Sequence, residues 1–446
     1  MAEVKNLDFQ FSVGWEKSGG KSNNVWGTVP FPPELLKYIN EYKSTPIYVY
    51  DARTGEQIKK ENNKPSVWTA YDDFIYTKFG HVVQKDLPRI SATFKSCFGK
   101  YSAVVENLGM RLAMELDMPT SYNEIVAFDP KEYPKIVANY PNQDKIKNLQ
   151  PVGIVSIDFL QNKKISPKYS KTDMSLDSGK TVEISSINTV EGDKLVSFED
   201  AVRKYLHGVN NLSGEENLIE NWITAVDEMA RKELKNCPRE LVNKKISHVH
   251  GRIARAFLLR EFLGDCDFTA YNGGVVINDA TKDFSYAPNH DYGESFNALT
   301  KIKLEFDPLC GMTQEVFDKL PENLKEKIRE TKEKESRMSV SDVAKTFASS
   351  TSEQNLHYVL NNFPEACDEF FENLDKLAQS GKFNTIVDSY TDMTVNGQPL
   401  LSKDDAKMFK EYIVERSSHM SLMYIDHLQS QGRTVPQVVV TELEKE

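Results

Sequence analysis

The spacing of apolar residues along the chain changes from strand-like in its first part to helical in its last part. Short apolar runs and period-two alternation, both typical of strands, occupy the front of the sequence. Between them, apolar residues at three- and four-residue steps predict a helix over 101–116, which Pro119 ends. The predicted strands lie at 9–13, 47–50, 74–76, 81–83, 125–128 and 152–157. The polar segment 160–195 predicts a loop.

A helical period takes over in the second half of the chain. Ser197–Asp200 has the side chains of a helix N-terminal box. A further helix over 246–259 ends at Gly264, and the chain after Thr300 is mainly helical, with 322–335 forming a charged, solvent-exposed helix face. This order of elements predicts an α+β chain with a β-rich front and a mostly helical back.

Charge and composition narrow the class of protein. The chain has 446 residues and a net charge of −11, which argues against direct nucleic-acid binding because phosphate contacts require a basic surface. The negative net charge is compatible with a bound nucleotide, since a few local cations and a metal can hold one. No apolar run reaches the ~18 residues of a membrane span, and the first residues lack the pattern of a signal peptide.

The cysteines favour a reduced compartment. All five are scattered, and no two form a Cys-x-x-Cys pair. We therefore expect neither a disulfide framework nor a structural zinc site, and a cytoplasmic location.

Three polar residues in the middle of the chain carry the main chemical signal: Asp267, Asn272 and Asp291. The first two follow the end of a predicted helix. Apolar runs at 275–277 and 284–286 predict a short hairpin that returns the chain to Asp291. Phosphoryl transfer requires a carboxylate for the acceptor hydroxyl and oxygen ligands for Mg²⁺. The pattern therefore predicts Asp267 as the base and Asn272 and Asp291 as metal ligands, with a polar surface turn as the alternative.

The same stretch resembles the catalytic segment of the HipA-like family of bacterial serine/threonine kinases, which includes the CtkA-type secreted kinases. The resemblance consists of Leu-Gly-Asp-x-Asp at 263–267, an asparagine five residues further on, and Pro-x-x-Asp-x-Gly at 288–293. It implies a bilobal protein-kinase-like fold. Residues 1–158 would form the N-terminal β-rich lobe with one long helix, and 159–300 the lobe with the catalytic loop and the metal-binding hairpin. Residues 301–446 would form the helical remainder of that lobe or a C-terminal helical domain.

The resemblance also implies contacts to ATP from the first lobe. Glu106, on the predicted helix, would pair with a strand lysine that contacts the phosphates. Lys85 is the first choice for this lysine, with Lys78 and Lys95 as alternatives. The strand at 152–157 and the residue after it resemble the segment that links the two lobes. There the backbone of three residues would bind adenine: Ser156, Ile157 and Asp158.

The implied activity is ATP- and Mg²⁺-dependent transfer to a serine or threonine hydroxyl of a protein, with 166–195 offering sites for autophosphorylation. One departure leaves the activity open. Family members carry His, and other protein kinases Lys, two positions after the base, but this chain has Thr269. A pseudokinase that acts as a nucleotide-binding interaction module is therefore one alternative, and a small-molecule or lipid kinase is another. The oligomeric state and delivery into a host cell as an effector both stay open.

Overall fold

The computed structural model defines a mixed α and β chain, as the sequence predicts. It describes residues 2–11, 24–30, 48–50, 57–59, 89–97, 99–129, 131–132, 149–157, 172–175, 181–184, 193–206, 215–278, 282–305, 309 and 314–434.

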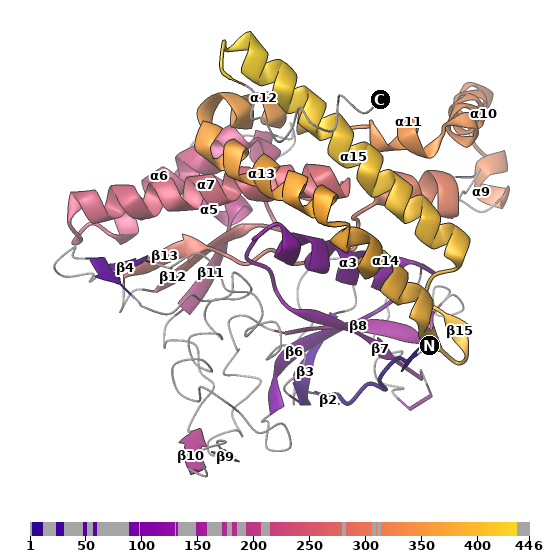
Figure 1. Ribbon diagram of the computed structural model, residues 1–446, viewed down its shortest axis with the longest axis horizontal. Helices are drawn as coiled ribbons and strands as arrows, with labels where there is room; N and C mark the ends of the chain where they lie inside the picture. The colour runs from indigo at the N-terminus through magenta and orange to yellow at the C-terminus, as the bar shows by residue number, and fades with distance from the viewer. Residues whose placement is uncertain are drawn as a thin grey trace.

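The first part of the chain forms a five-stranded antiparallel sheet, in the order β2-β3-β6-β8-β7 (Figure 1). Its strands are β2 (Gln10–Phe11), β3 (Asn24–Pro30), β6 (Arg89–Ser96), β7 (Asn123–Ala127) and β8 (Val152–Ile157). Helix α3 (Ser102–Glu115) packs against β7 and β8. The predicted helix over 101–116 and the predicted strands at 125–128 and 152–157 are therefore confirmed, to within two residues at each end.

Two central strands of this sheet, β3 and β6, were not among the predicted strands. The predicted strands at 74–76 and 81–83 lie outside the described residues. The predicted strand at 47–50 is confirmed as β4 (Tyr48–Tyr50), which pairs with β5 (Gln57–Lys59).

The polar segment 160–195 was predicted to be a loop, and this prediction is wrong where the structure describes it. Strands β9 (Thr172–Ser175) and β10 (Thr181–Ile184) pair with each other. Strand β11 (Asp193–Ser197) pairs with β12 (Gly274–Asn278) in a second antiparallel sheet completed by β13 (Asp283–Tyr286). Polar side chains do not prevent strand formation when the backbone pairs with an existing strand, so the apolar pattern alone missed β11.

The rest of the chain is mainly helical. Its helices are α5 (Phe198–Tyr205), η4 (Glu215–Asn217), α6 (Ile219–Glu233), α7 (Arg239–Leu263), α8 (Asn297–Leu299), η5 (Thr300–Leu304), α9 (Gln314–Asp318), α10 (Glu322–Arg337), α11 (Val340–Ala344), α12 (Ser352–Asn362), α13 (Pro364–Ser380), α14 (Lys382–Asp392) and α15 (Lys403–Ser430). The remaining short strands are β1 (Ala2–Glu3), β14 (Met393–Val395) and β15 (Gln398–Pro399). Helix α10 buries none of its residues, which confirms the predicted exposed helix.

The sequence signals at the helix ends are confirmed as well. Ser197 Oγ accepts a hydrogen bond from the Asp200 amide at 3.0 Å, so it caps α5. Gly264 ends α7 with φ +61°, a left-handed conformation that glycine adopts without steric cost.

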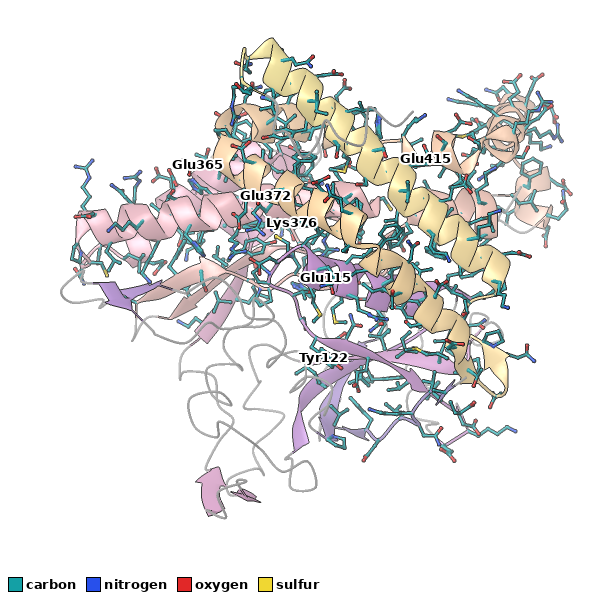
Figure 2. All side chains as sticks on the ribbon, in the orientation of Figure 1. Glu115, Tyr122, Glu365, Glu372, Lys376 and Glu415 are labelled. Carbon is teal, nitrogen blue, oxygen red and sulfur yellow. The ribbon has the colours of Figure 1, made fainter. Side chains whose placement is uncertain are left out.

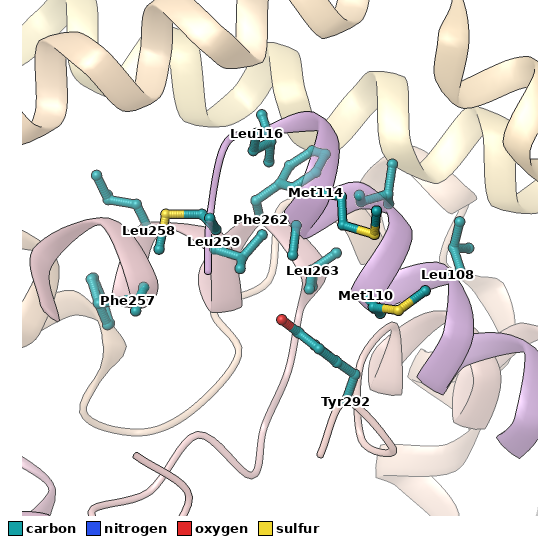
Figure 3. Close-up of a cluster of buried hydrophobic side chains, with 14 of the residues drawn as sticks. Leu108, Met110, Met114, Leu116, Phe257, Leu258, Leu259, Phe262, Leu263 and Tyr292 are labelled. Carbon is teal, nitrogen blue, oxygen red and sulfur yellow. The ribbon is translucent and has the colours of Figure 1, made fainter. Parts of the chain in front are cut away.

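Helices α3 and α7 share the centre of the hydrophobic core. Figure 3 shows Met110 and Met114 of α3, Leu259 and Leu263 of α7, and Tyr292 in one buried cluster. All five side chains are at most 1% exposed. The helix that carries Glu106 and the helix that leads into the Asp267 loop are therefore held in one packed unit.

The outer face of the helical layer is charged. In Figure 2, Glu365 and Glu372 of α13 point away from the core, whereas Glu115 lies where α3 meets α14. There Lys382 Nζ donates to Glu115 Oε2 at 2.9 Å. None of the described helices carries an apolar stretch that is long enough to cross a membrane.

Candidate active site

Lys95 links three segments of the chain. It lies on strand β6, and its Nζ donates to Glu106 Oε2 at 3.1 Å and to Asp291 Oδ1 at 2.8 Å. Glu106 projects from helix α3, and its other oxygen, Oε1, accepts a hydrogen bond from the Tyr292 amide at 2.9 Å. One lysine therefore joins the sheet, the helix and the loop that follows the hairpin.

Of the three lysines proposed as partners of Glu106, Lys95 is the one that the described part of the chain brings to it. Lys85, the first choice, and Lys78 both lie outside the described residues. The signal for Lys95 was the alternation of apolar and polar residues over 90–95, which is the pattern of a half-buried strand.

The loop after α7 brings Asp267 and Asn272 together. Asn272 Nδ2 donates to the Asp267 carboxylate at 3.0 Å and to the Asp267 carbonyl at 2.7 Å. The Thr269 amide donates to the same carbonyl at 2.9 Å, and the Thr269 carbonyl accepts from the Asn272 amide at 3.0 Å. The five-residue spacing is thus closed into a compact turn with Thr269 at its centre. Asn272 Oδ1 takes part in none of these bonds.

The predicted hairpin is confirmed, and the chain that follows it reaches Lys95. In β12 and β13, Val275 pairs with Tyr286 and Ile277 pairs with Phe284. Beyond the hairpin the chain reaches Asp291, whose φ is +58°. Aspartate is one of the few side chains that tolerate this left-handed conformation.

Gly293 allows the close approach of the loop to the ion pairs. A Cβ atom at this position would lie 2.7 Å from Lys95 Nζ and 3.0 Å from Glu106 Oε2. A larger residue in place of the glycine of the Asp-Tyr-Gly sequence would therefore have to displace the charged ends of Lys95 and Glu106.

Burial and charge act against each other at this cluster. Burial lowers the pKa of Lys95, yet the carboxylates of Glu106 and Asp291 outweigh it and raise that pKa above its ordinary value. Burial also favours a neutral Asp291, but the charge of Lys95 holds the pKa of Asp291 below its ordinary value. Glu106 is 3% exposed, and burial raises its pKa. Lys95 is therefore a fixed cation and Asp291 a fixed anion near neutral pH.

Asp267 has a different electrostatic environment. Its side chain is partly exposed, and partial burial is the largest cause that raises its pKa. The hydrogen bond from Asn272 lowers that pKa, whereas the negative charges of Asp291 and Asp265 raise it. The result is a carboxylate that binds a proton more readily than an isolated aspartate does.

The strand proposed to bind adenine ends at the edge of the described residues. Ser156 and Ile157 are the last two residues of β8, and Asp158 lies outside the described residues. The Ile157 amide donates to the Tyr122 carbonyl at 2.8 Å, and the Ile157 carbonyl accepts from Ser121 Oγ at 2.7 Å. Because the Ile157 amide already donates a hydrogen bond within the protein, it is not free to bind adenine.

Two further residues of the site, Arg260 and Asp265, were not assigned a role from the sequence. Arg260 Nη1 forms an ion pair with Asp265 and donates to the Asp291 carbonyl at 2.9 Å. Arg260 stands in an apolar helical stretch, so its sequence context indicated a helix position and nothing more.

The chain is a mixed α and β fold in which a sheet lysine forms ion pairs with a helix glutamate and a loop aspartate. No family model matches this chain, and no curated protein matches its sequence. Among solved structures, the chain is similar to the Helicobacter pylori proinflammatory kinase CtkA, with a TM-score of 0.40 and 11% identity over 80% of this chain and 98% of that chain.

It is also similar to the HipA of Shewanella oneidensis, solved as a toxin–antitoxin complex with HipB and operator DNA. The TM-score is 0.37 and the identity is 12%, over 90% of this chain and 74% of that chain. The resemblance to HipA-like and CtkA-like kinases is therefore confirmed as a structural resemblance.

Proposed function

We propose that this chain is a kinase-like phosphotransferase that moves the γ-phosphoryl group of ATP, with Mg²⁺, to a serine or threonine hydroxyl of a protein. The observation that carries this proposal is the bonding of Lys95 to both Glu106 and Asp291. Protein kinases use a lysine held by a glutamate for the phosphates and an aspartate for the metal, together with a base for the acceptor hydroxyl. On this proposal the five-stranded sheet with α3 is the first lobe and the helical part is the second.

Each residue then has one task. Lys95, fixed by Glu106, contacts the phosphates, and Asp267 orients the acceptor hydroxyl and takes its proton. Asn272 holds the Asp267 carboxylate through its Nδ2, which leaves Oδ1 for a metal. Adenine would contact the end of β8 and the residue that follows.

The donor atoms of the site fit Mg²⁺. This ion takes oxygen ligands from one or two side chains and completes its shell with phosphates and water. Asn272 Oδ1 and the Asp291 carboxylate are donors of this kind. No group of three or more His, Cys, Asp or Glu residues suited to a metal occurs among the described residues, and a site shared with ATP needs none. The bound ion would neutralise charge on the phosphates.

Thr269 favours one alternative, a pseudokinase that binds nucleotide and acts as an interaction module. It lies at the centre of the turn between Asp267 and Asn272, where a histidine or lysine would stabilise the charge of the phosphoryl group in transfer. A neutral threonine supplies no such cation, so slow transfer or none is the specific expectation of this alternative.

The test is incubation of the full chain with γ-labelled ATP and Mg²⁺, alone and with generic protein acceptors. Label is expected on serine or threonine of the chain or of an acceptor, and Asp267→Ala is expected to lose it. Full transfer by Asp267→Ala would show that Asp267 is not the base. A Mg²⁺-dependent thermal shift with ATP but no transfer would favour the pseudokinase, and label on a small molecule or lipid instead of protein would change the acceptor class.

A further inference from the structure

The last turn of α7 carries a buried arginine that contacts both loops of the site. Arg260 is 1% exposed. Its Nη2 donates to the His290 carbonyl at 2.6 Å, and its Nη1 donates to the Asp291 carbonyl at 2.9 Å. The guanidinium lies 4.2 Å from the centre of the Tyr292 ring, within reach of a cation–π contact. The backbone on both sides of Asp291 is therefore fixed by one side chain.

Asp265 completes the link to the other loop. It is 2% exposed and forms an ion pair with Arg260. Its Oδ1 accepts from the Asp267 amide at 3.0 Å, and its Oδ2 accepts from Ser295 Oγ at 3.2 Å. A continuous path of hydrogen bonds thus runs from the Asp267 backbone through Asp265 and Arg260 to the Asp291 backbone.

We propose that Arg260 and Asp265 form a positioning pair that sets the distance between the base Asp267 and the metal ligand Asp291. The inference deepens the proposed phosphotransferase function and rests on it. Neither residue touches substrate in this role. The planar guanidinium offers several donors in a rigid fork, so it can hold two carbonyls and a carboxylate at the same time.

The same helix provides a matched control. The next residue, Glu261, pairs with Arg416 of α15 at 3.2 Å, and Arg416 Nε donates to the Glu261 carbonyl at 2.8 Å. The side chains of this pair are 7% and 2% exposed, close to the 2% and 0% of Arg260 and Asp265. One buried pair faces the site and the other faces the C-terminal helices, so stability and positioning can be separated.

The test compares two double variants of the full chain, Arg260→Met with Asp265→Asn and Arg416→Met with Glu261→Gln. Each removes both charges of a pair with little change in volume, because a single substitution would leave a buried charge unpaired. The readouts are the thermal midpoint, kcat, KM for ATP, and hydrogen exchange of peptides that cover 264–272 and 288–296.

For the Arg260 and Asp265 variant we expect kcat to fall by about 10²-fold, the cost typical of a displacement near 1 Å, with KM for ATP within a few-fold. Exchange should rise in both peptides. The Arg416 and Glu261 variant should lower the thermal midpoint at least as much and leave kcat unchanged. Arg260→Lys, with Asp265 kept, should retain part of the rate that the double variant loses, since its ammonium keeps the charge beside Asp265 and can still reach one carbonyl.

Equal loss of kcat in both double variants would show that Arg260 and Asp265 only stabilise the core, and it would overturn the proposal. An unchanged kcat in the Arg260 and Asp265 variant would do the same. If the wild-type chain transfers no phosphate, the proposed function fails, but the exchange measurement still decides whether the pair holds the two loops. Unchanged exchange in both peptides would then reject it.

Discussion

Lys95 Nζ lies 2.8 Å from Asp291 Oδ1, although the two residues are 196 positions apart in the chain. The contact joins strand β6 to the loop that follows the β12–β13 hairpin. It places a fixed cation beside the proposed metal ligand, where it would contact the α- and β-phosphates of ATP on the proposed function.

Lys95→Met should lower the rate of phosphoryl transfer by about 10²- to 10³-fold, because a fixed positive charge at the phosphates is lost. The matched control is Lys85→Met, the same change at the lysine that the sequence placed first. The measurement is kcat/KM for ATP of both variants. If Lys85→Met loses the rate and Lys95→Met keeps it, the phosphate-binding lysine is Lys85.

Asp291→Asn should abolish the part of ATP affinity that depends on Mg²⁺, because the amide is a much weaker ligand than the carboxylate. Asparagine is the suitable change, since it tolerates the φ of +58° that alanine would strain. Asp117→Asn is the control, with φ +55° and a place outside the site. Titration calorimetry with and without Mg²⁺ measures the difference. Metal-dependent affinity that survives in Asp291→Asn excludes Asp291 as a ligand.

The transfer rate should fall as the pH falls through the raised pKa of Asp267, because only the carboxylate can accept the proton of the acceptor. Burial is the main cause of that shift, and nearby negative charges, including Glu294, add to it. The acid limb should therefore lie above the ordinary aspartate pKa of about 3.9, and Glu294→Gln should move it to lower pH. The profile of kcat/KM against pH measures both effects. A limb that persists unchanged in Asp267→Asn would belong to another group.

The parts of the site that could be predicted from the sequence are those formed by residues close together in the chain. Asp267 and Asn272 meet within one turn, and the hairpin before Asp291 is fixed by neighbouring apolar runs. Gly264 and Ser197 marked helix ends through capping rules that need only a few residues.

The contacts that sequence could not assign are made across long separations. Sequence placed Lys85 first as the partner of Glu106, with Lys78 and Lys95 as alternatives. Strand pairing in the folded sheet is what brings Lys95 to Glu106. Arg260 lies in an apolar helix, and its role appears only when the 288–292 loop returns to it. Strand β11 was missed for the same reason, because its partner β12 follows much later in the chain.

Gly109 of α3 packs directly against Tyr292, the residue that follows Asp291. A Cβ there would lie 2.7 Å from Tyr292 Cβ. The Tyr292 ring is 0% exposed, and its hydroxyl is held by Thr120 Oγ1 at 2.8 Å, so it has no room to yield. Gly109→Ala should therefore destabilise the fold by about 1–3 kcal/mol through overpacking. It should also slow transfer, because α3 carries Glu106.

Gly251→Ala is the matched control on α7, where an added Cβ meets no atom within 4 Å. Alanine in an open helix position should stabilise the fold by about 0.5–1 kcal/mol and leave transfer unchanged. Urea unfolding of both variants, with rates measured on the same preparations, gives the comparison. If Gly109→Ala matches Gly251→Ala in stability and rate, then α3 can shift away from Tyr292 without disturbing Glu106, and the close packing of helix and loop does not constrain the site.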